Sequence, residues 1–289
     1  MKPAQNQKKT PAAYGIIGLP LGHSKSPVLH NWGLRDAGLP GRYEAWPTEP
    51  AKLKAFVAEV RARHIKGVSV TIPHKQAVVP FLDGLTERAQ AVGAVNTLFW
   101  QDGKLMGDNT DVAGILAPLQ GWLAANPDAA LASALILGAG GASRAACAAL
   151  KELGIPDIAL ANRTASKAES VAKDFGLRTV PWEERGSNAG QPWGLILNTT
   201  PLGTTGSHEG LTPMPAEALP GTRLVFDMVY NPIRTPLLDQ AASAGCAILS
   251  GLSMFLHQGL EQFRIWTGVS LDPRQAQKLL MADMLCTGK

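Results

Sequence analysis

Four groups of polar residues stand at the predicted ends of strands in the first half of the sequence. They are Ser24 with Ser26, Thr71 with Lys75, Asn96, and Asp111. Two hydroxyls two residues apart can both hydrogen-bond one carboxylate, and Asn, Asp and Lys supply the mixed donors and acceptors that ring hydroxyls require. Together these groups predict a binding site for a hydroxylated acid.

Lys75 and Asp111 are the pair in this set that offers both a proton donor and a proton acceptor. Reduction of a ketone or oxidation of an alcohol needs such a pair, because a proton moves to or from the oxygen. Each residue also has an ordinary explanation, since Ser26 can cap a helix, Asp111 can turn a loop and a single lysine is most often solvated. The hypothesis therefore rests on the group and not on any one member.

A glycine-rich turn follows the apolar run at 134–137 and precedes a helix-forming run. It consists of Gly138, Ala139, Gly140, Gly141 and Ala142, and it is followed by Ser143. Glycines here permit a tight turn and let a pyrophosphate approach the backbone, where free N–H groups and the positive end of the helix dipole meet it. Ser143 replaces the third glycine of the usual pattern and is still small. A dinucleotide site is predicted, and a glycine-rich turn without a ligand is the alternative.

The residues after the next strand indicate which dinucleotide binds. NAD enzymes usually place an acid about 20 residues after the glycines, where it holds the ribose 2′-hydroxyl. The run here has no carboxylate and consists of Asn162, Arg163, Thr164, Ala165, Ser166 and Lys167. An arginine, a hydroxyl and a lysine pair with a 2′-phosphate, which an acid would repel. NADP is therefore predicted, and the alternative is that Arg163 and Lys167 are ordinary surface charges.

Short apolar runs and helical patterns alternate between residues 14 and 119, as in a sheet with helices packed on it. Strands are expected at 14–18, at 42–46 and at 68–72, where Pro73 ends the strand. Helices are expected from Pro27, capped by Ser26, and over 53–60. Asp102-Gly103, between 95–100 and 104–106, predicts a hairpin.

From about residue 131 the alternation of strand, turn and helix becomes regular, which implies parallel strands with right-handed crossovers. Strands are expected at 134–137, 157–161, 178–180, 194–198, 224–227 and 247–249. A helix after Gly251 and a last helix begun by Asp272-Pro273 should return to the first part. We expect an α/β fold with two domains and a cleft between them. Residues 1–119, completed by 252–289, would form a substrate-binding domain, and residues 120–251 a doubly wound Rossmann-type domain that binds NADP.

The composition excludes several classes of protein. With 289 residues, 45% hydrophobic and 17% charged, the chain is long enough for two cores and is neither disordered nor collagen-like. Its net charge of +4 comes from 27 basic and 23 acidic residues that are scattered, which predicts no nucleic-acid partner. The N-terminal residues lack a signal-peptide core and no apolar stretch is long enough to span a membrane, so no membrane partner is expected.

The cysteines and histidines bear on the compartment and on metals. The three cysteines, Cys147, Cys246 and Cys286, are an odd number at wide spacings, which indicates buried thiols in a reducing compartment and a cytoplasmic protein. The six histidines show no ligand spacing, so no metal is expected. His23 and His74, next to the polar groups, are interpreted as hydrogen-bonding loop residues.

An ordered series of motifs extends over most of the sequence. They are YGIIGLPLGHSKSPVLHN, GVSVTIPHK, AVGAVNTL, GDNTD, GAGGASRA, NRT, NTTPLG, DMVYNP, TPLL and GLSMFLHQG. From Tyr14 to about Leu285 the sequence resembles the shikimate dehydrogenase family. The resemblance implies an enzyme of chorismate and aromatic amino-acid biosynthesis that interconverts 3-dehydroshikimate and shikimate with NADPH.

The resemblance also implies roles for individual residues. Ser24, Ser26 and Tyr230 would bind the substrate carboxylate, and Thr71, Asn96, Asp111 and Gln258 would hold the ring hydroxyls. Lys75 and Asp111 would form the catalytic pair, with Lys75 delivering the proton to the carbonyl oxygen. Met228 and Gly251 would lie beside the nicotinamide, and Glu87 of the TERA run would approach it.

Several positions depart from the family's usual pattern. Leu19 and Ser69 stand where Asn is common, Val112 stands where Gly is common, and Phe255 and Gly259 flank the glutamine unusually. Since none is assigned to proton transfer, we expect altered affinity and loop packing with the reaction unchanged. Two alternatives remain: a quinate/shikimate dehydrogenase with relaxed substrate or NAD use, and a catalytically silent NADP sensor. A homodimer is also left open.

Overall fold

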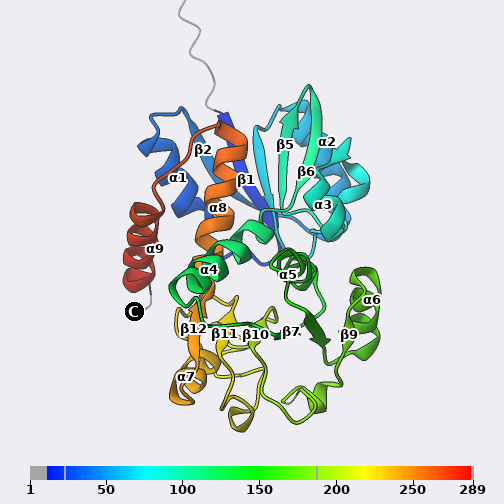
Figure 1. Ribbon diagram of the computed structural model, residues 1–289. Coiled ribbons are helices and arrows are strands. Elements are labelled where there is room, and N and C mark those ends of the chain that lie inside the picture. Colours follow the sequence, from blue (N-terminus) through cyan, green and yellow to red (C-terminus); the bar gives the residue numbers. More distant parts are fainter. Residues whose placement is uncertain (1–11, 23, 187, 288–289) are drawn as a thin grey trace, which may run out of the picture.

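The computed structural model describes residues 12–22, 24–186 and 188–287 (Figure 1). These residues form two six-stranded sheets, one above the other in Figure 1, each with helices packed on it. This confirms the expected α/β class. The N-terminal segment 1–11 and His23 lie outside the described residues, and so do the expectations made for them.

The first sheet is mixed and has the strand order β2-β1-β3-β5-β6-β4. Its strands are β1 (Ala12–Gly18), β2 (Gly41–Pro47), β3 (Gly67–Val70), β4 (Gly84–Leu85), β5 (Thr97–Gln101) and β6 (Lys104–Asp108). Strand β1 runs parallel to β2 and β3, whereas β5 runs antiparallel to β3 and β6. The hairpin predicted between β5 and β6 is confirmed, and Asp102 and Gly103 both have positive φ angles, of 50° and 76°, as its tight turn requires.

The helices of this part are α1 (Ser26–Asp36), α2 (Leu53–Ala62), α3 (Glu87–Val92) and α4 (Asp111–Ala125), with short 3-10 turns η1 (Pro50–Lys52) and η2 (Val79–Phe81). Side chains of β1 alternate between the two faces of the sheet. Ile17 packs with Val57 of α2 on one face, and Tyr14 and Ile16 pack with Phe263 on the other. Both faces are therefore covered.

Two local predictions in this part are wrong. Ser26 does not cap α1, because Lys25 is already nearly helical and Ser26 is the first helical residue. Its backbone N–H instead donates to the Ser24 hydroxyl at 3.3 Å. The strand predicted over 68–72 ends at Val70, because the chain turns there, with the His74 N–H donating to the Thr71 carbonyl at 2.9 Å. Ile72 is thereby carried out of the sheet and is 67% exposed.

The second sheet has the order β12-β11-β10-β7-β8-β9, and every neighbouring pair in it is parallel. Its strands are β7 (Ser133–Leu137), β8 (Asp157–Ala161), β9 (Arg178–Thr179), β10 (Leu195–Asn198), β11 (Leu224–Asp227) and β12 (Ala247–Ser250). The strand order reverses between β7 and β10, as in a doubly wound dinucleotide-binding fold. All six predicted strands are present, with bounds that differ by at most one residue at either end.

Helices lie on both faces of this sheet. They are α5 (Gly141–Glu152), α6 (Ala165–Phe175) and α7 (Pro236–Ser243), with short 3-10 turns η3 (Trp182–Glu184) and η4 (Ala216–Ala218). Ala134 and Ile136 of β7 belong to the core cluster that contains α5 and α6, while Leu135 and Leu137 belong to the cluster that contains α7. Burial on both faces explains why these strands are apolar throughout rather than alternating.

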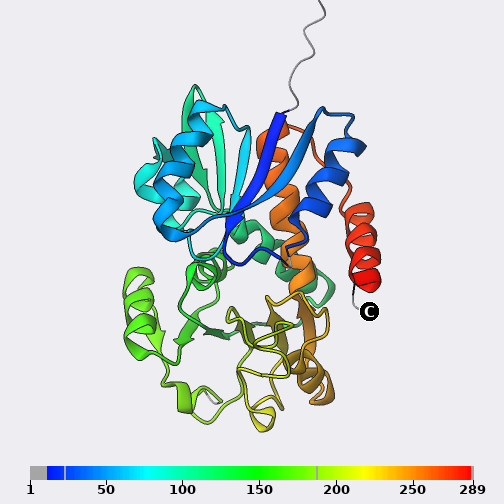
Figure 2. The same ribbon diagram turned by 180° about the vertical axis from the view of Figure 1, so that it is seen from behind.

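The chain then returns to the first sheet through α8 (Gly251–Thr267) and α9 (Pro273–Thr287). Helix α8 packs along α4 and reaches β5, and Figure 2 shows α9 at the outer edge beside α1. Asp272 begins α9 as predicted, since its side chain accepts from the Arg274 and Gln275 N–H groups at 2.7 and 3.3 Å. Within the described ranges, none of the helices combines the length and apolar character needed to cross a bilayer.

Candidate active site

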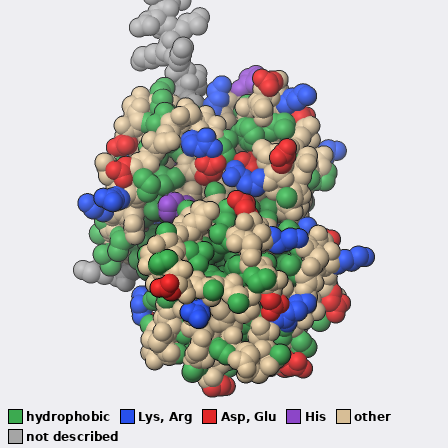
Figure 3. Space-filling view, viewed as in Figure 1, with side chains coloured by type: hydrophobic (Ala, Val, Ile, Leu, Met, Phe, Trp, Pro, Cys, Tyr) green, Lys and Arg blue, Asp and Glu red, His purple; other side chains and the backbone are tan. Residues whose placement is uncertain are grey.

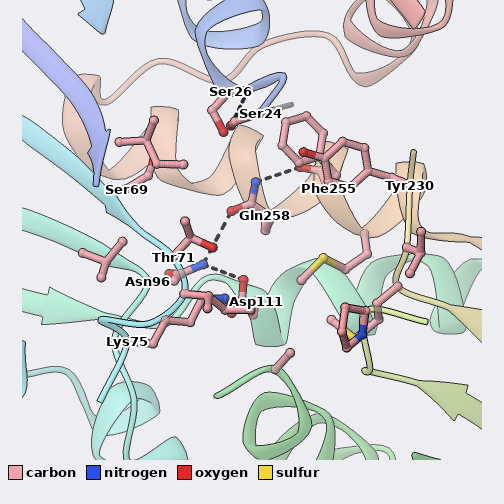
Figure 4. A pocket seen from close by; sticks show the side chains of 18 of the residues that line it. Ser24, Ser26, Ser69, Thr71, Lys75, Asn96, Asp111, Tyr230, Phe255 and Gln258 are labelled. Carbon is pink, nitrogen blue, oxygen red and sulfur yellow. Dashed lines mark hydrogen bonds and ion pairs between the residues drawn. The ribbon is translucent and has the colours of Figure 1, made fainter. Parts of the chain in front are cut away.

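A cavity of about 390 Å³ opens where the ends of the strands of both sheets meet. Its walls come from β1, β3 and the loops after them on one side, from the loops after β10 and β11 on the other, and from α8. Figure 4 shows the side chains that line it, among them Ser24, Lys75, Asp111 and Gln258. All eight residues predicted to contact substrate line this cavity: Ser24, Ser26, Thr71, Lys75, Asn96, Asp111, Tyr230 and Gln258.

Lys75 and Asp111 form an ion pair at the base of the cavity. Lys75 Nζ lies 2.5 Å from Asp111 Oδ2, and the two side chains are 15% and 4% exposed. Lys75 reaches this place because the turn after β3 carries it out of the sheet, and Asp111 because it is the first residue of α4. A pair so close and so little hydrated interacts much more strongly than one at the surface. The arrangement can hold a proton at a fixed point of the cavity.

Asn96 links this pair to the rest of the cavity wall. Its Nδ2 donates to Asp111 Oδ1 at 2.7 Å and to the Thr110 hydroxyl at 2.9 Å, and Gln258 Oε1 lies at 3.5 Å (Figure 4). Its Oδ1 accepts from the Thr110 N–H at 2.8 Å and from the Thr97 hydroxyl at 2.7 Å. Because amide nitrogen and oxygen both have suitable partners, the Asn96 side chain is fixed in one orientation.

The opposite end of the cavity carries hydroxyls next to an aromatic wall. Ser24 and Ser26 lie together above Gln258 in Figure 4, and Ser26 is 4% exposed. Tyr230 stacks on Phe255 with ring centroids 4.7 Å apart, and burial raises the pKa of its hydroxyl. Three neutral hydroxyl donors on a rigid wall can bind a carboxylate without a buried cation. Phe255, singled out in the sequence as unusual, forms this wall.

The glycine-rich turn begins at Gly138, directly after β7. Gly138 has φ = 114°, a conformation that favours glycine, and a Cβ at Gly140 would meet nothing within 4 Å. The Ser143 hydroxyl donates to the Gly140 carbonyl at 2.6 Å, and Ser143 is fully buried, so this small residue takes the close-packed position of the third glycine. The backbone at the start of α5 is therefore accessible to an anion.

The glycine-rich turn lies against Lys75 of the Lys75–Asp111 ion pair, which belongs to the part of the chain that forms the first sheet. A Cβ at Gly141 would lie 3.3 Å from Cβ and Cδ of Lys75, and Ala142 lines the cavity beside it. The first turn of α5 and the lysine thus share one wall, although the sequence separates them widely. A dinucleotide on this turn would extend toward Lys75.

The residues predicted to select NADP form an exposed loop after β8, running into the start of α6. Asn162 Nδ2 donates to the Thr164 carbonyl at 2.9 Å, which shapes the loop. Arg163 and Lys167 are exposed, and neither joins an ion pair with any residue in the described ranges. Two positively charged side chains that form no ion pair among the described residues, placed beside a helix N-terminus, can bind a phosphate group.

Met228 lines the far wall of the cavity, and Gly251 lies directly behind it without lining the cavity itself. A Cβ at Gly251 would be 2.3 Å from the Met228 carbonyl oxygen, so the close approach of these two chains needs a glycine. Met228 lines the cavity, and its N–H donates to the Asn198 carbonyl at 3.0 Å. Glu87, by contrast, is the exposed first residue of α3 and does not line the cavity, and its assignment stays a prediction.

Buried Asp227 supports the Met228 segment and was missed by sequence reasoning, although it is the first residue of DMVYNP. Its carboxylate accepts from Asn198 Nδ2 at 2.9 Å, from the Thr235 hydroxyl at 2.6 Å and from the Val229 N–H at 3.0 Å. Burial raises the pKa of Asp227 to about 6, against these hydrogen bonds, which lower it. An acid at the end of an otherwise apolar strand was the available signal.

Tyr43 and Gln262 were also missed. Gln262 lines the cavity one helical turn after Gln258 on α8, and that spacing was the signal that could have found it. Tyr43 lies in β2 and gave no signal, because its contacts are made across the sheet. Ser69, noted in the sequence as a departure from the family pattern, hydrogen-bonds to both.

The histidines next to the site make structural contacts. His74 is fully buried, and its Nε2–H donates to the Thr48 carbonyl at 2.7 Å, in agreement with the hydrogen-bonding interpretation. His30 is buried between aromatic rings, and burial lowers its pKa to about 3. Across residues 12–22, 24–186 and 188–287 no three His, Cys, Asp or Glu side chains are grouped to hold a metal ion.

Charges of both signs are interspersed on the face of the molecule seen in Figure 3. Hydrophobic side chains lie between them, toward the middle of this face. Neither sign occupies a continuous stripe there of the kind that tracks a nucleic-acid backbone.

Comparison with known proteins agrees with this geometry. Residues 16–98 match the shikimate dehydrogenase substrate binding domain, residues 124–184 match shikimate / quinate 5-dehydrogenase, and residues 251–281 match the shikimate 5′-dehydrogenase C-terminal domain. Shikimate dehydrogenase (NADP(+)) of Maridesulfovibrio salexigens is 48% identical over 271 residues, which are 94% of this chain and 97% of that protein. The Oleidesulfovibrio alaskensis enzyme of the same name is 49% identical over 277 residues, 95% of this chain and 96% of the relative.

Solved structures of shikimate and quinate dehydrogenases also superpose on this chain. Shikimate 5-dehydrogenase from Thermus thermophilus, in complex with NADP(H) and shikimate, superposes with a TM-score of 0.83 at 37% identity and covers 94% of this chain and 99% of its own. Quinate dehydrogenase from Corynebacterium glutamicum, in complex with NAD, superposes with a TM-score of 0.84 at 30% identity, with coverage of 94% and 99%.

Proposed function

The chain belongs to the shikimate dehydrogenase family, and we propose that it catalyses the reversible NADP-dependent reduction of 3-dehydroshikimate to shikimate. As a member of this family it is an oxidoreductase that acts on a CH–OH group with NADP. The observation that carries the proposal is the Lys75–Asp111 ion pair, 2.5 Å long, in a cavity whose wall includes the first turn of α5.

The substrate carboxylate would bind at the hydroxyl end of the cavity. Ser24 and Ser26 are two residues apart at the start of α1, and Tyr230 faces them from the loop after β11. Thr71, Asn96, Asp111 and Gln258 would hold the ring hydroxyls, because together they offer both donors and acceptors along one wall. The C–OH carbon of the substrate would then lie near Lys75.

Lys75 would act on the proton. Reduction adds a hydride to the carbonyl carbon and a proton to the carbonyl oxygen, and the ammonium of Lys75 is the donor within reach of that oxygen. Asp111 holds Lys75 Nζ in place through Oδ2, and Asn96 holds Asp111 through Oδ1. In the reverse direction the same amine takes the proton from the shikimate hydroxyl.

The NADP cofactor supplies the hydride when bound. Gly138, Ala139, Gly140, Gly141 and Ala142 would hold its pyrophosphate at the N-terminus of α5. Arg163, Thr164, Ser166 and Lys167 would bind the 2′-phosphate, with Asn162 and Ala165 shaping the loop. Met228 and Gly251 would lie beside the nicotinamide, with Glu87 near it. The fit is supported by the open backbone at Gly140 and by the absence of a carboxylate over 162–167.

The proposal also assigns the two functions to two domains of the chain. Residues 1–119 with 252–289 would form the substrate-binding domain and residues 120–251 the NADP domain, which places the boundary inside α4. The protein would work in the cytoplasm, where its free cysteines stay reduced. Cys147 and Cys246 are buried as predicted, but the prediction is wrong for Cys286, which is exposed on α9. We propose small-molecule partners and no nucleic-acid or membrane partner.

A quinate/shikimate dehydrogenase with relaxed substrate or NAD use is the second candidate. It is favoured by the likeness to a quinate dehydrogenase in complex with NAD. It is disfavoured by the residues of the site, since both serines are present at the carboxylate end and no acid occurs at 162–167. A silent NADP sensor is disfavoured because Lys75 and Asp111 are both present and paired.

One experiment separates these candidates. Shikimate and quinate are each oxidised with NADP and with NAD, and the absorbance of the reduced nicotinamide is followed. We expect activity with shikimate and NADP. Comparable activity with quinate or with NAD would favour the second candidate, and no activity in any combination would overturn the proposal.

A further inference from the structure

An ion pair ties the turn that carries Ser24 and Ser26 to the last helix of the chain. Lys25 stands between the two serines, and its Nζ lies 2.7 Å from Oδ2 of Asp283 on α9. The two side chains are 14% and 27% exposed, so most of the pair is shielded from water. Such a pair interacts more strongly than one at the surface, where solvent screens the charges. The chemistry proposed above makes no use of it.

The Lys25 side chain extends to α9, although both of its neighbours face the cavity. Ser24 and Ser26 line the cavity, whereas Lys25 does not. Its ammonium lies against α9, which packs beside α1 (Figure 2). The lysine between the two serines therefore does not offer its charge to a carboxylate bound in the cavity.

The backbone of Lys25 forms the turn between the two serines and the start of α1. Its φ and ψ angles of −88° and 2° lead the chain into the helix, and its carbonyl accepts from the Leu29 N–H at 3.1 Å. The Ser26 N–H donates to the Ser24 hydroxyl at 3.3 Å across the same turn. Because Lys25 is bonded to both serines, a shift of its backbone would move both hydroxyls. A fixed Lys25 side chain limits that movement.

Helix α9 is a firm support for this ion pair, because it is anchored in a core. Leu280 and Met284 of α9 share a core cluster with Leu29 of α1, and Tyr230 packs against the same cluster. Asp283 directly precedes Met284, so its carboxylate is held by a helix that packs on α1. The same helix therefore supports all three hydroxyls of the carboxylate end.

We propose that Asp283 is a positioning residue for carboxylate binding, which holds Ser24 and Ser26 in place through its ion pair with Lys25. The inference rests on the proposed function, since it needs a substrate carboxylate at the two serines. Hydroxyls that are already held in position lose less conformational freedom when the anion binds, so the affinity is higher. Asp283 thus acts through Lys25 and does not touch the substrate.

The test compares Asp283→Asn with wild type in shikimate oxidation. Asparagine keeps the size of the side chain and removes its charge, so the ion pair is lost. We expect the KM for shikimate to rise about 5-fold, with kcat and the KM for NADP nearly unchanged, because only the carboxylate end of the cavity loosens. Asp36→Asn is the matched control, since it removes the same charge from an exposed position on α1 and should leave all three constants unchanged.

A double-mutant cycle tests whether the effect passes through Lys25. Lys25→Met should raise the KM for shikimate by a similar factor, and the variant with both changes should be no worse than either single variant. A lysine that attracted the substrate directly would give the opposite result in Asp283→Asn. Its ammonium could then approach the carboxylate of the substrate, and the KM would fall.

Coupling to the serines excludes a merely structural effect. In a Ser26→Ala background, Asp283→Asn should raise the KM by about 2-fold or less, because one of the hydroxyls that it positions is missing. In a Thr71→Val background the full effect of about 5-fold should remain, because Thr71 is assigned to a ring hydroxyl. A general loosening of the fold would raise the KM equally in both backgrounds.

The outcomes distinguish this inference from the proposed function. An active wild type with an unchanged or lowered KM in Asp283→Asn, or equal effects in the two backgrounds, would overturn the inference and leave the function standing. A wild type that neither oxidises nor binds shikimate would overturn both.

Discussion

The Arg144 guanidinium donates from Nε to the carbonyl oxygen of Val92 at 2.6 Å. Val92 ends α3 beside the first sheet, and Arg144 belongs to α5 of the second, so one side chain joins the two layers of the molecule. The last carbonyls of a helix have no partner within the helix, and a cation placed there is stabilised by the helix dipole as well. Arg144 Nη1 also pairs with Asp174 of α6 at 2.6 Å.

Replacing Arg144 by Met should lower the free energy of unfolding by about 1–3 kcal/mol, because it leaves the Val92 carbonyl without its partner. Chemical denaturation followed by circular dichroism measures this. Arg234→Met is the control, because Arg234 pairs with Asp239 at the surface, where both side chains are more than half exposed. The expected change there is below about 1 kcal/mol, and equal losses in both variants would contradict the prediction.

Lys75→Ala should lose turnover by a factor of about 10²–10⁴ while keeping the fold, because it removes the proton donor and leaves the core intact. Steady-state kcat for shikimate oxidation measures the loss of turnover, and a circular dichroism spectrum shows whether the fold is kept. Lys66→Ala, at an exposed position before β3, serves as the control and should retain full activity. An unaffected rate in Lys75→Ala would remove this lysine from the mechanism.

Asn162→Asp should shift the cofactor preference from NADP toward NAD, because a carboxylate at this position repels the 2′-phosphate and accepts from the 2′-hydroxyl. We expect the ratio of kcat/KM for NADP to that for NAD to fall at least tenfold. Arg223→Ala, which removes an exposed charge elsewhere on the same sheet, should leave the ratio unchanged. If the ratio stays constant in Asn162→Asp, the loop after β8 does not contact the 2′ position.

Gly251→Ala should impair both stability and nicotinamide binding, because the new methyl group would lie 2.3 Å from the Met228 carbonyl and force the two segments apart. We expect a loss of about 1–3 kcal/mol in the free energy of unfolding and a raised KM for NADP. Gly121→Ala in α4 is matched to it, since a Cβ there meets nothing within 4 Å. Alanine favours a helix by up to about 1 kcal/mol over glycine, so this control should be neutral or stabilising.

Asp227 should make the stability of the protein depend on pH. Its folded-state pKa of about 6 lies above the ordinary value, so the folded state binds the proton more tightly. The stabilisation is complete below about pH 4 and is lost as the pH rises through about 6. The unfolding free energy of wild type, compared with that of Asp227→Asn, should therefore fall by on the order of 2 kcal/mol over this interval. A constant difference would show that Asp227 has an ordinary pKa.

The sequence predicts the second sheet well, because strands buried on both faces are short apolar runs separated by glycine turns. It fails at Ile72, where the period of two continues after the strand has ended and the turn bond from His74 to Thr71 takes over. It fails at Ser26, because which of two nearby serines supports a helix start depends on the angles of Lys25. Local turns of this kind are decided by backbone geometry that composition does not determine.

In the candidate site, too, local sequence patterns predict some residues and miss others. The residues that line the cavity are predicted where they belong to polar motifs at strand ends, as with Lys75 and Asp111. Tyr43 and Gln262 are not predicted, because their role depends on contacts between residues far apart in the chain, such as the bond from Gln262 to the carbonyl of Asn96. A backbone carbonyl is present at every residue, so the residue type does not reveal which carbonyl accepts a hydrogen bond.

The return of the last two helices to the first sheet has a consequence for synthesis of the protein. Tyr14 and Tyr43 share a core cluster with Phe263 and Leu271, which are near the end of the chain. While the middle of the chain is being synthesised, this face of the first sheet is covered by α1 and still lacks α8, whereas the core of the second sheet is nearly complete. Folding during translation should therefore complete the second sheet before the α8-covered face of the first sheet is closed, although the opposite face of the first sheet packs on α2 early.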